Sequence, residues 1–182
     1  MNQINSILFV CLGNICRSPT AEGVLKALLA AQAPHLEVEV DSAGTGDYHI
    51  GEPPDLRSQS SALQRGVDLS GLRARQVKPE DFTRFDLILA MDRRNLRALE
   101  GMRPRGSKAH LALFLDYAEE LRGGEVPDPY FGETIDFEHV LDIVTTAARG
   151  LLAHLQGGGD DADASREISR ARRTGRRRGT DS

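Results

Sequence analysis

The residues with the clearest chemical potential stand close to the N-terminus. Cys11 follows the apolar run Ile7–Val10, and Arg17 comes six positions after Cys11. Five intervening residues are enough for a loop that surrounds one tetrahedral oxyanion with backbone N–H groups. The planar fork of Arg17 can then bind two oxygens of the anion. The spacing predicts a phosphate-binding loop with a nucleophile inside it.

The residues after Arg17 predict how this loop ends. Ser18 is a good N-cap and Pro19 suits the first helical position, so we expect a helix to begin here. The helix dipole favours both a bound anion and the thiolate form of Cys11. Ser18 can also donate a hydrogen bond to that thiolate. This context alone leaves one alternative open, in which Cys11 is only a small buried apolar residue.

Three segments of the chain resemble the low molecular weight protein tyrosine phosphatases. They are CLGNICRSP at residues 11–19, DSAGT at 41–45 and DPYFG at 128–132. They stand in the family's order and at its usual separations, and the resemblance covers Ile4 to Leu155, including ARQV at 74–77. It implies a cofactor-independent enzyme that hydrolyses phosphotyrosine in proteins through a phosphocysteine intermediate.

The resemblance also implies the catalytic roles. Cys11 is the nucleophile, Arg17 holds the phosphate, and Asp128 is the general acid and later the base toward water. The reaction needs an acid because an unprotonated tyrosine oxygen leaves poorly. Taken alone, Asp128 between Pro127 and Pro129 is typical of a simple turn.

The remaining site residues are expected to bind substrate or support the loop. Tyr48 and Tyr130 match the family's aromatic walls around a phenyl ring, although two aromatic residues far apart in sequence are, taken alone, more typical of core or surface packing. Asn14 tolerates left-handed backbone, and the resemblance makes Ser42 its neighbour. It also implies that Cys16 pairs with Cys11 under oxidation. The loop residues expected around the anion are Leu12, Gly13, Asn14, Ile15, Cys16 and Ser18.

Two positions depart from the family pattern. Phe131 replaces a second tyrosine, which removes a site of regulation by phosphorylation. Leu72 stands where many relatives have histidine, so we expect one hydrogen bond that supports the loop to be absent.

Three other functions compete with this interpretation. A protein arginine phosphatase of the same fold would carry threonine in place of Ile15. An arsenate reductase would need more cysteines than the two present. A non-catalytic module that binds phosphoproteins would need neither a thiolate nor an acid such as Asp128.

The pattern of apolar residues indicates the elements that position these side chains. Strands are predicted at residues 4–10, 36–41, 85–91 and 109–115, and helices at 19–32, 55–65, 92–99 and 133–155, with Asp92 capping the third helix. This alternation predicts a single-domain, Rossmann-like α/β fold. Its four-stranded parallel sheet has helices on both faces, and the phosphate-binding loop follows the first strand.

Composition divides the 182-residue chain in two. Residues 1–156 form the predicted phosphatase domain, with 16 basic and 22 acidic side chains, a balance that argues against a nucleic-acid partner. Residues 157–182, a Gly/Asp stretch followed by an Arg-rich segment, are predicted to be a disordered tail. Its basic side chains suit docking to an anionic partner.

The sequence also suggests where the protein works. The two cysteines lie five residues apart, which does not suit a disulfide framework. The first residues lack a basic region, and the apolar run behind them is too short to be expected to act as a signal peptide or membrane span. We therefore expect a cytoplasmic protein, monomeric or weakly self-associating. The five histidines have no metal-ligand spacing, so no metal is expected.

Overall fold

The computed structural model describes residues 3–157. Four strands, β1 (Ser6–Cys11), β2 (Glu39–Gly44), β3 (Leu87–Ala90) and β4 (His110–Leu113), pair in the order β2-β1-β3-β4, and every pairing is parallel. The predicted α/β fold and four-stranded parallel sheet are therefore confirmed. The tail predicted at 157–182 lies, apart from Gly157, outside the described residues.

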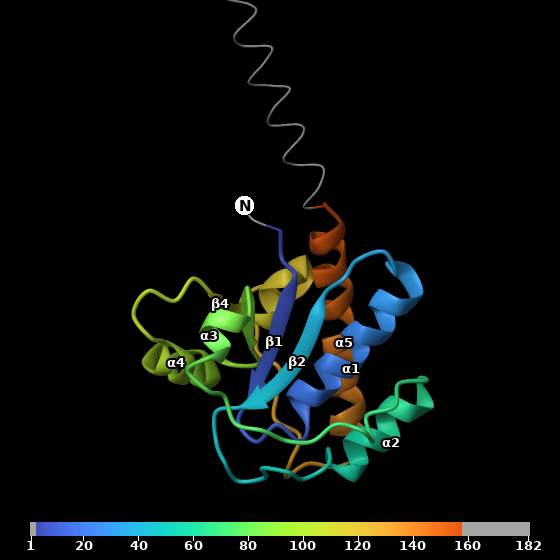
Figure 1. Cartoon of the computed structure of the whole chain (residues 1–182). Helices are drawn as coiled ribbons and strands as arrows, with labels where there is room; N and C mark the ends of the chain where they lie inside the picture. Colours follow the sequence, from blue (N-terminus) through green and yellow to red (C-terminus); the bar gives the residue numbers. More distant parts are fainter. Residues whose placement is uncertain (1–2, 158–182) are drawn as a thin grey trace, which may run out of the picture.

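Helices cover both faces of this sheet (Figure 1). The α-helices are α1 (Arg17–Gln32), α2 (Leu56–Gln64), α3 (Asp81–Arg84), α4 (Arg93–Met102) and α5 (Thr134–Gly157), and two 3-10 turns are η1 (Phe114–Tyr117) and η2 (Glu119–Leu121). Helices α1 and α5 pack on one face, and α3 and α4 on the other. None of the helices within residues 3–157 is long and apolar enough to cross a membrane.

Strand β1 supplies the centre of the core on both faces. Ile7 and Phe9 point into the cluster under α1 and α5, whereas Leu8 and Val10 point into the cluster under α3 and α4. Successive side chains of a strand alternate between faces, so a central parallel strand is apolar throughout. All four side chains are fully buried. This strand is therefore a rigid support for the residue that follows it, Cys11.

The start of α1 differs from the prediction. The helix begins at Arg17, the N-cap position is Cys16, and no side chain caps it. Ser18 is not the cap, because its hydroxyl contacts Cys11 and Asn14 instead of a backbone N–H of the first turn. Pro19 lies at the third helical position, still within the first turn, where a missing N–H is tolerated.

The predicted cap of α4 is confirmed. Asp92 accepts a hydrogen bond from the backbone N–H of Asn95 at 2.8 Å, and the helix starts at Arg93. The second strand lies at Glu39–Gly44 rather than at 36–41, and it pairs Cys11 with Gly44 at the end of β1. The carboxyl ends of β1 and β2 therefore meet where the loop begins.

Candidate active site

The loop after β1 folds back over the sulfur of Cys11. The backbone N–H of Asn14 donates to Cys11 Sγ at 3.3 Å, and the hydroxyl of Ser18 lies 3.0 Å from the same sulfur. Asn14 has φ of 56°, in the left-handed region where Asn is better tolerated than most residues. Cys11 is almost fully buried. The loop therefore directs two hydrogen-bonding groups at one thiol.

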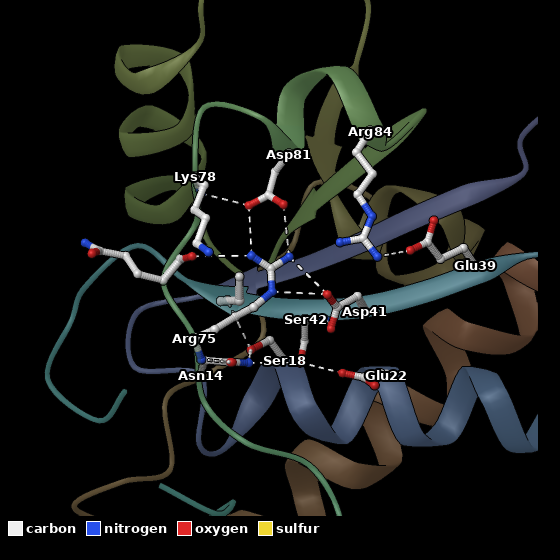
Figure 2. A network of polar contacts seen from close by, with 12 residues as sticks. Asn14, Ser18, Glu22, Glu39, Asp41, Ser42, Arg75, Lys78, Asp81 and Arg84 are labelled. Carbon is white, nitrogen blue, oxygen red and sulfur yellow. Dashed lines mark hydrogen bonds and ion pairs between the residues drawn. The ribbon is translucent and has the colours of Figure 1, made fainter. Parts of the chain in front are cut away.

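A relay of hydrogen bonds fixes the direction of the Ser18 hydroxyl (Figure 2). The side-chain amide of Asn14 donates to Ser18 Oγ at 2.8 Å and to Ser42 Oγ at 2.9 Å. Ser18 Oγ lies 3.0 Å from Cys11 Sγ and 3.4 Å from the carbonyl oxygen of Ala43. When Cys11 is a thiolate, the hydroxyl is the donor of the shorter contact. The expected proximity of Asn14 and Ser42 is thus present.

A buried carboxylate completes this relay. Ser42 donates to Glu22 Oε1 at 2.7 Å, and the other oxygen of Glu22 pairs with Lys26. Glu22 is buried although it lies on α1, one turn after Ser18. Sequence reasoning missed Glu22; an acidic residue on the helix face that follows the loop was the available signal.

The segment of residues 74–77 braces the loop from outside (Figure 2). The backbone N–H of Arg75 donates to Asn14 Oδ1 at 3.0 Å. The guanidinium of Arg75 binds both oxygens of Asp81, at 2.9 and 3.0 Å, and also contacts Asp41. Burial opposes the charge of Arg75, but these carboxylates outweigh it and raise its pKa. The Leu72 side chain has no hydrogen-bonding group, and the contact from this segment to Asn14 comes from the backbone of Arg75, three residues further on.

Arg17 joins the loop to two distant segments. It is buried, and its guanidinium donates to Asp92 Oδ2 at 2.7 Å and to the carbonyl of Val126 at 3.1 Å. Burial alone would lower the pKa of Arg17, but the negative charges of Cys11 and Asp92 raise it above its usual value. Arg17 therefore stays charged beside the sulfur. Its pairing with Asp92 was not anticipated.

Asp128 reaches the same guanidinium from the solvent side. Its Oδ2 lies 3.6 Å from Arg17 Nη2, and about half of the side chain is exposed. Its Oδ1 accepts a hydrogen bond from the backbone N–H of Tyr130 at 3.1 Å. The structure thus brings Cys11, Arg17 and Asp128 together at one site, with the carboxyl group at its open side.

The two predicted aromatic residues, Tyr48 and Tyr130, are accessible to solvent. Tyr48 is 72% exposed and Tyr130 is 37% exposed. The His49 ring, which was not predicted to be part of the site, has its centroid 6.1 Å from that of Tyr130. Phe131 is 97% exposed and packs edge-on against Tyr130. The rim is therefore rich in rings that are free to contact an aryl group.

Arg57 holds the segment that carries Tyr130. Its guanidinium donates to the carbonyls of Tyr130 at 3.0 Å and Gly132 at 3.3 Å, and lies 4.3 Å from the centroid of the Phe137 ring. It also binds Asp55, the N-cap of α2. This tie between α2 and the Tyr130 segment was missed, because it joins residues 73 positions apart.

Close packing explains the glycine that ends β2. A Cβ on Gly44 would lie 2.6 Å from the carbonyl oxygen of Leu12, so any other residue would displace the loop. That same carbonyl accepts a hydrogen bond from Gly46 at 2.9 Å. A Cβ on Gly13 would lie 3.1 Å from the ring of His49. The backbone of the loop is thus held against the residues that follow β2.

Cys16 differs from Cys11 in its electrostatic surroundings. Burial, with the nearby charges of Asp55 and Cys11, raises the pKa of Cys16 to about 12. Its side chain belongs to a small apolar cluster with Ile15, Ala74 and Phe137. Both thiols are free. No three His, Cys, Asp or Glu side chains of residues 3–157 are arranged to hold a metal ion.

Comparison with known sequences assigns the chain to a family. Residues 6–160 match the family model for low molecular weight phosphotyrosine protein phosphatase. The chain is 42% identical over 151 residues to the low molecular weight protein-tyrosine-phosphatase YfkJ of Bacillus subtilis, covering 83% of this chain and 96% of that one. It is 43% identical over 149 residues to the human low molecular weight phosphotyrosine protein phosphatase, covering 81% and 93% of the two chains.

Solved structures agree with this assignment. A protein tyrosine phosphatase from Entamoeba histolytica with Hepes in its active site superposes with a TM-score of 0.78 at 39% identity, covering 85% of this chain and 99% of the other. The structure of Bacillus subtilis YfkJ gives a TM-score of 0.78 at 40% identity, covering 86% and 98%. The chain belongs to the low molecular weight phosphotyrosine protein phosphatase family.

Proposed function

We propose that this site hydrolyses phosphotyrosine in proteins, with Cys11 as nucleophile, Arg17 as phosphate clamp and Asp128 as general acid and base. The observation that carries the proposal is the convergence of these three side chains. The hydroxyl of Ser18 and the N–H of Asn14 meet the sulfur at 3.0 and 3.3 Å, and Arg17 lies between the loop and Asp128.

In the first step, the Cys11 thiolate attacks phosphorus. The S–P bond forms while the bond from phosphorus to the tyrosine oxygen breaks, and the protonated Asp128 gives its proton to that oxygen. Loop N–H groups and the guanidinium of Arg17 stabilise the negative charge on the equatorial oxygens. The hydrogen bond from Ser18 keeps the sulfur in its thiolate form until it attacks.

In the second step, water replaces the thiolate. Asp128, now a carboxylate, takes a proton from the attacking water, the new P–O bond forms, and the S–P bond breaks. The electron pair returns to Cys11, where Ser18 and Asn14 stabilise the leaving thiolate. Inorganic phosphate is released and Asp128 is protonated again. The cycle requires no other group.

The rim supports an aryl phosphate as substrate. We propose that the exposed rings of Tyr48 and Tyr130 form the walls that contact the phenyl group, and that Leu12, Gly13, Ile15 and Cys16 complete the loop around the phosphate. Stacking against rings favours phosphotyrosine over the shorter, aliphatic phosphoserine. Ile15 packs against Phe137 in an apolar cluster, which supports tyrosine rather than arginine as the phosphorylated residue.

Two further assignments accompany this proposal. We propose that Cys16 forms a disulfide with Cys11 under oxidation and so protects the nucleophile from irreversible damage. Two free thiols within one loop also support a reducing compartment, the cytoplasm, as the place of action.

The function is tested by steady-state hydrolysis of a phosphotyrosine peptide near pH 6. Wild type and Cys11→Ser are prepared identically and assayed with a chelator present. We expect turnover in wild type and none in Cys11→Ser. A phosphoarginine peptide is assayed in parallel; turnover of that substrate alone would replace tyrosine with arginine in the proposal, and turnover of neither would favour a binding module.

A further inference from the structure

A groove lined by three arginines and three acidic residues adjoins Asp128 at the active site. It has a volume of about 370 Å³ and lies between the first turns of α4 and the segment that precedes Asp128. Its lining residues are Asp92, Arg93, Arg94, Arg97, Glu125, Val126, Pro127 and Asp128. Because Asp92 and Asp128 both contact Arg17, the groove is continuous with the phosphate site.

The acidic residues that line the groove have partners of their own. Asp92 is engaged by Arg17 at 2.7 Å and by the N–H of Asn95 at 2.8 Å. Glu125 accepts from the backbone N–H of Arg93 at 2.7 Å and lies 3.7 Å from its guanidinium. Asp128 in turn lies 3.6 Å from Arg17, so each acidic residue of the groove already has a positively charged neighbour.

Two arginines of the groove remain available. Arg94 and Arg97 are exposed, and within residues 3–157 neither forms an ion pair. They are three positions apart on α4, so they lie on the same side of the helix. Desolvation is small for exposed guanidinium groups, so an incoming carboxylate gains attraction at little cost.

We propose that Arg94 and Arg97 form a subsite for an acidic side chain next to the phosphotyrosine of the substrate. This inference rests on the proposed function, and it names the preferred substrate class: phosphotyrosine segments with Asp or Glu beside the modified residue. Asp128 both contacts Arg17 of the phosphate site and lines the groove, so a peptide residue beside the phosphotyrosine is within reach of the groove. Attraction across this groove increases the rate of productive encounter as well as affinity.

Kinetics on matched peptides test the subsite. Three phosphotyrosine peptides differ only in their flanking residues: Asp and Glu on the N-terminal side, the same residues on the C-terminal side, or Asn and Gln on both sides. We expect kcat/KM to be about fivefold higher for one acidic peptide than for the neutral one, the effect of two exposed charge pairs. In Arg94→Gln/Arg97→Gln this preference disappears, while hydrolysis of phenyl phosphate and of the neutral peptide is unchanged.

A matched variant separates a local effect from net charge. Arg105→Gln/Arg149→Gln also removes two exposed positive charges, but neither residue lines the groove, so it should keep the acidic preference. Equal kcat/KM on all three peptides, or a preference that persists in Arg94→Gln/Arg97→Gln, would overturn the subsite. If either result is found while phenyl phosphate and the peptides are still hydrolysed, only the subsite is overturned and the proposed phosphatase activity stands. Failure of wild type on every phosphorylated peptide would instead overturn the function itself and the subsite with it.

Discussion

One hydroxyl proton determines how the nucleophile is held. Ser18 accepts a hydrogen bond from Asn14 and so has its own proton free for Cys11. The orientation of Asn14 depends in turn on its left-handed backbone and on the N–H of Arg75. Ser18, the side chain of Asn14 and the backbone N–H of Arg75 thereby present one hydroxyl to the sulfur. Asn14 also donates to Ser42, whose hydroxyl donates to the buried Glu22.

At Asp128, removal of the acid should affect turnover more than binding. Asp128→Asn cannot donate a proton to the tyrosine oxygen, so we expect kcat on a phosphotyrosine peptide to fall by about 10² to 10⁴. The loss should shrink for aryl phosphates whose leaving groups are more acidic, which a series of substituted phenyl phosphates measures. Asp142→Asn, which alters an exposed carboxylate of α5, is the control. An equal loss across the series would contradict the role of Asp128.

The two thiols should differ in reactivity toward an alkylating agent. Cys16 has a pKa of about 12, raised by burial, so it remains protonated from pH 5 to pH 9 and lacks the reactive thiolate. We expect iodoacetamide to modify Cys11 first, as mass spectrometry of the digested protein would reveal. Burial does not distinguish the two, because both are almost inaccessible. If iodoacetamide modified Cys16 in Cys11→Ser as fast as it modifies Cys11 in wild type, this expectation would be contradicted.

Among the elements, local patterns were more predictable than contacts between distant segments. The loop at 11–17 and the Asp92 cap follow from residues that are neighbours in sequence, and both were predicted. Helix α3, η1 and η2 were missed because each has only three or four residues and carries no periodic signal. The Ser18 cap was wrong because a contact with Cys11, seven residues away, competed with the local preference.

Contacts between segments account for the other unpredicted features. Arg17 meets Asp92 across 75 positions, and Arg57 meets Tyr130 across 73. The chain has 27 acidic residues and many backbone carbonyl groups. The sequence alone therefore does not indicate that Arg17 binds Asp92 or that Arg57 binds the carbonyl of Tyr130. Only the order of the strands places the ends of β1 and β3 side by side, and with them Arg17 and Asp92.

Helix α2 should influence catalysis through Arg57. Arg57→Ala removes the donors that hold the carbonyls of Tyr130 and Gly132, so the Asp128 segment becomes less well positioned. We expect kcat/KM on a phosphotyrosine peptide to fall about tenfold, and Arg57→Lys to recover only part of it, since an ammonium lacks the planar fork. Arg65→Ala, at the other end of α2 and paired with exposed Asp142, is the control. Unchanged kinetics in Arg57→Ala would show that the hydrogen bonds from Arg57 to the Tyr130 segment are not needed for catalysis.

In the whole molecule, the site lies where the parallel strands end. Cys11 ends β1, Gly44 ends β2, and Asp92 follows β3 by two residues. Ligands of open α/β sheets bind at these carboxyl ends, because loops from separate strands converge there. The two hydrophobic clusters fix the strands from both faces, so the distances within the site depend on packing far from it.

Two glycine-to-alanine substitutions should distinguish the effect of close packing on stability from the effect of helix propensity. A Cβ on Gly150 in α5 would lie 2.1 Å from the carbonyl oxygen of Tyr117, so Gly150→Ala must displace backbone and should destabilise the protein by about 1 to 3 kcal/mol. A Cβ on Gly101 in α4 meets nothing within 4 Å, so Gly101→Ala should stabilise it by up to about 1 kcal/mol. Chemical denaturation measures both changes. Equal effects of the two variants would contradict the packing of α5 against η1.

The position of α5 has a consequence for the protein while it is being synthesised. Helix α1, which follows the nucleophile directly, buries Val24, Leu25 and Leu29 in the cluster that α5 completes. A ribosome produces the thiol and its arginine more than a hundred residues before it produces Thr134–Gly157. Until that helix emerges, the apolar face of α1 lacks its cover, and the loop lacks a fixed scaffold. A nascent chain that has not yet produced α5 therefore carries the nucleophilic sequence without the packing that positions it.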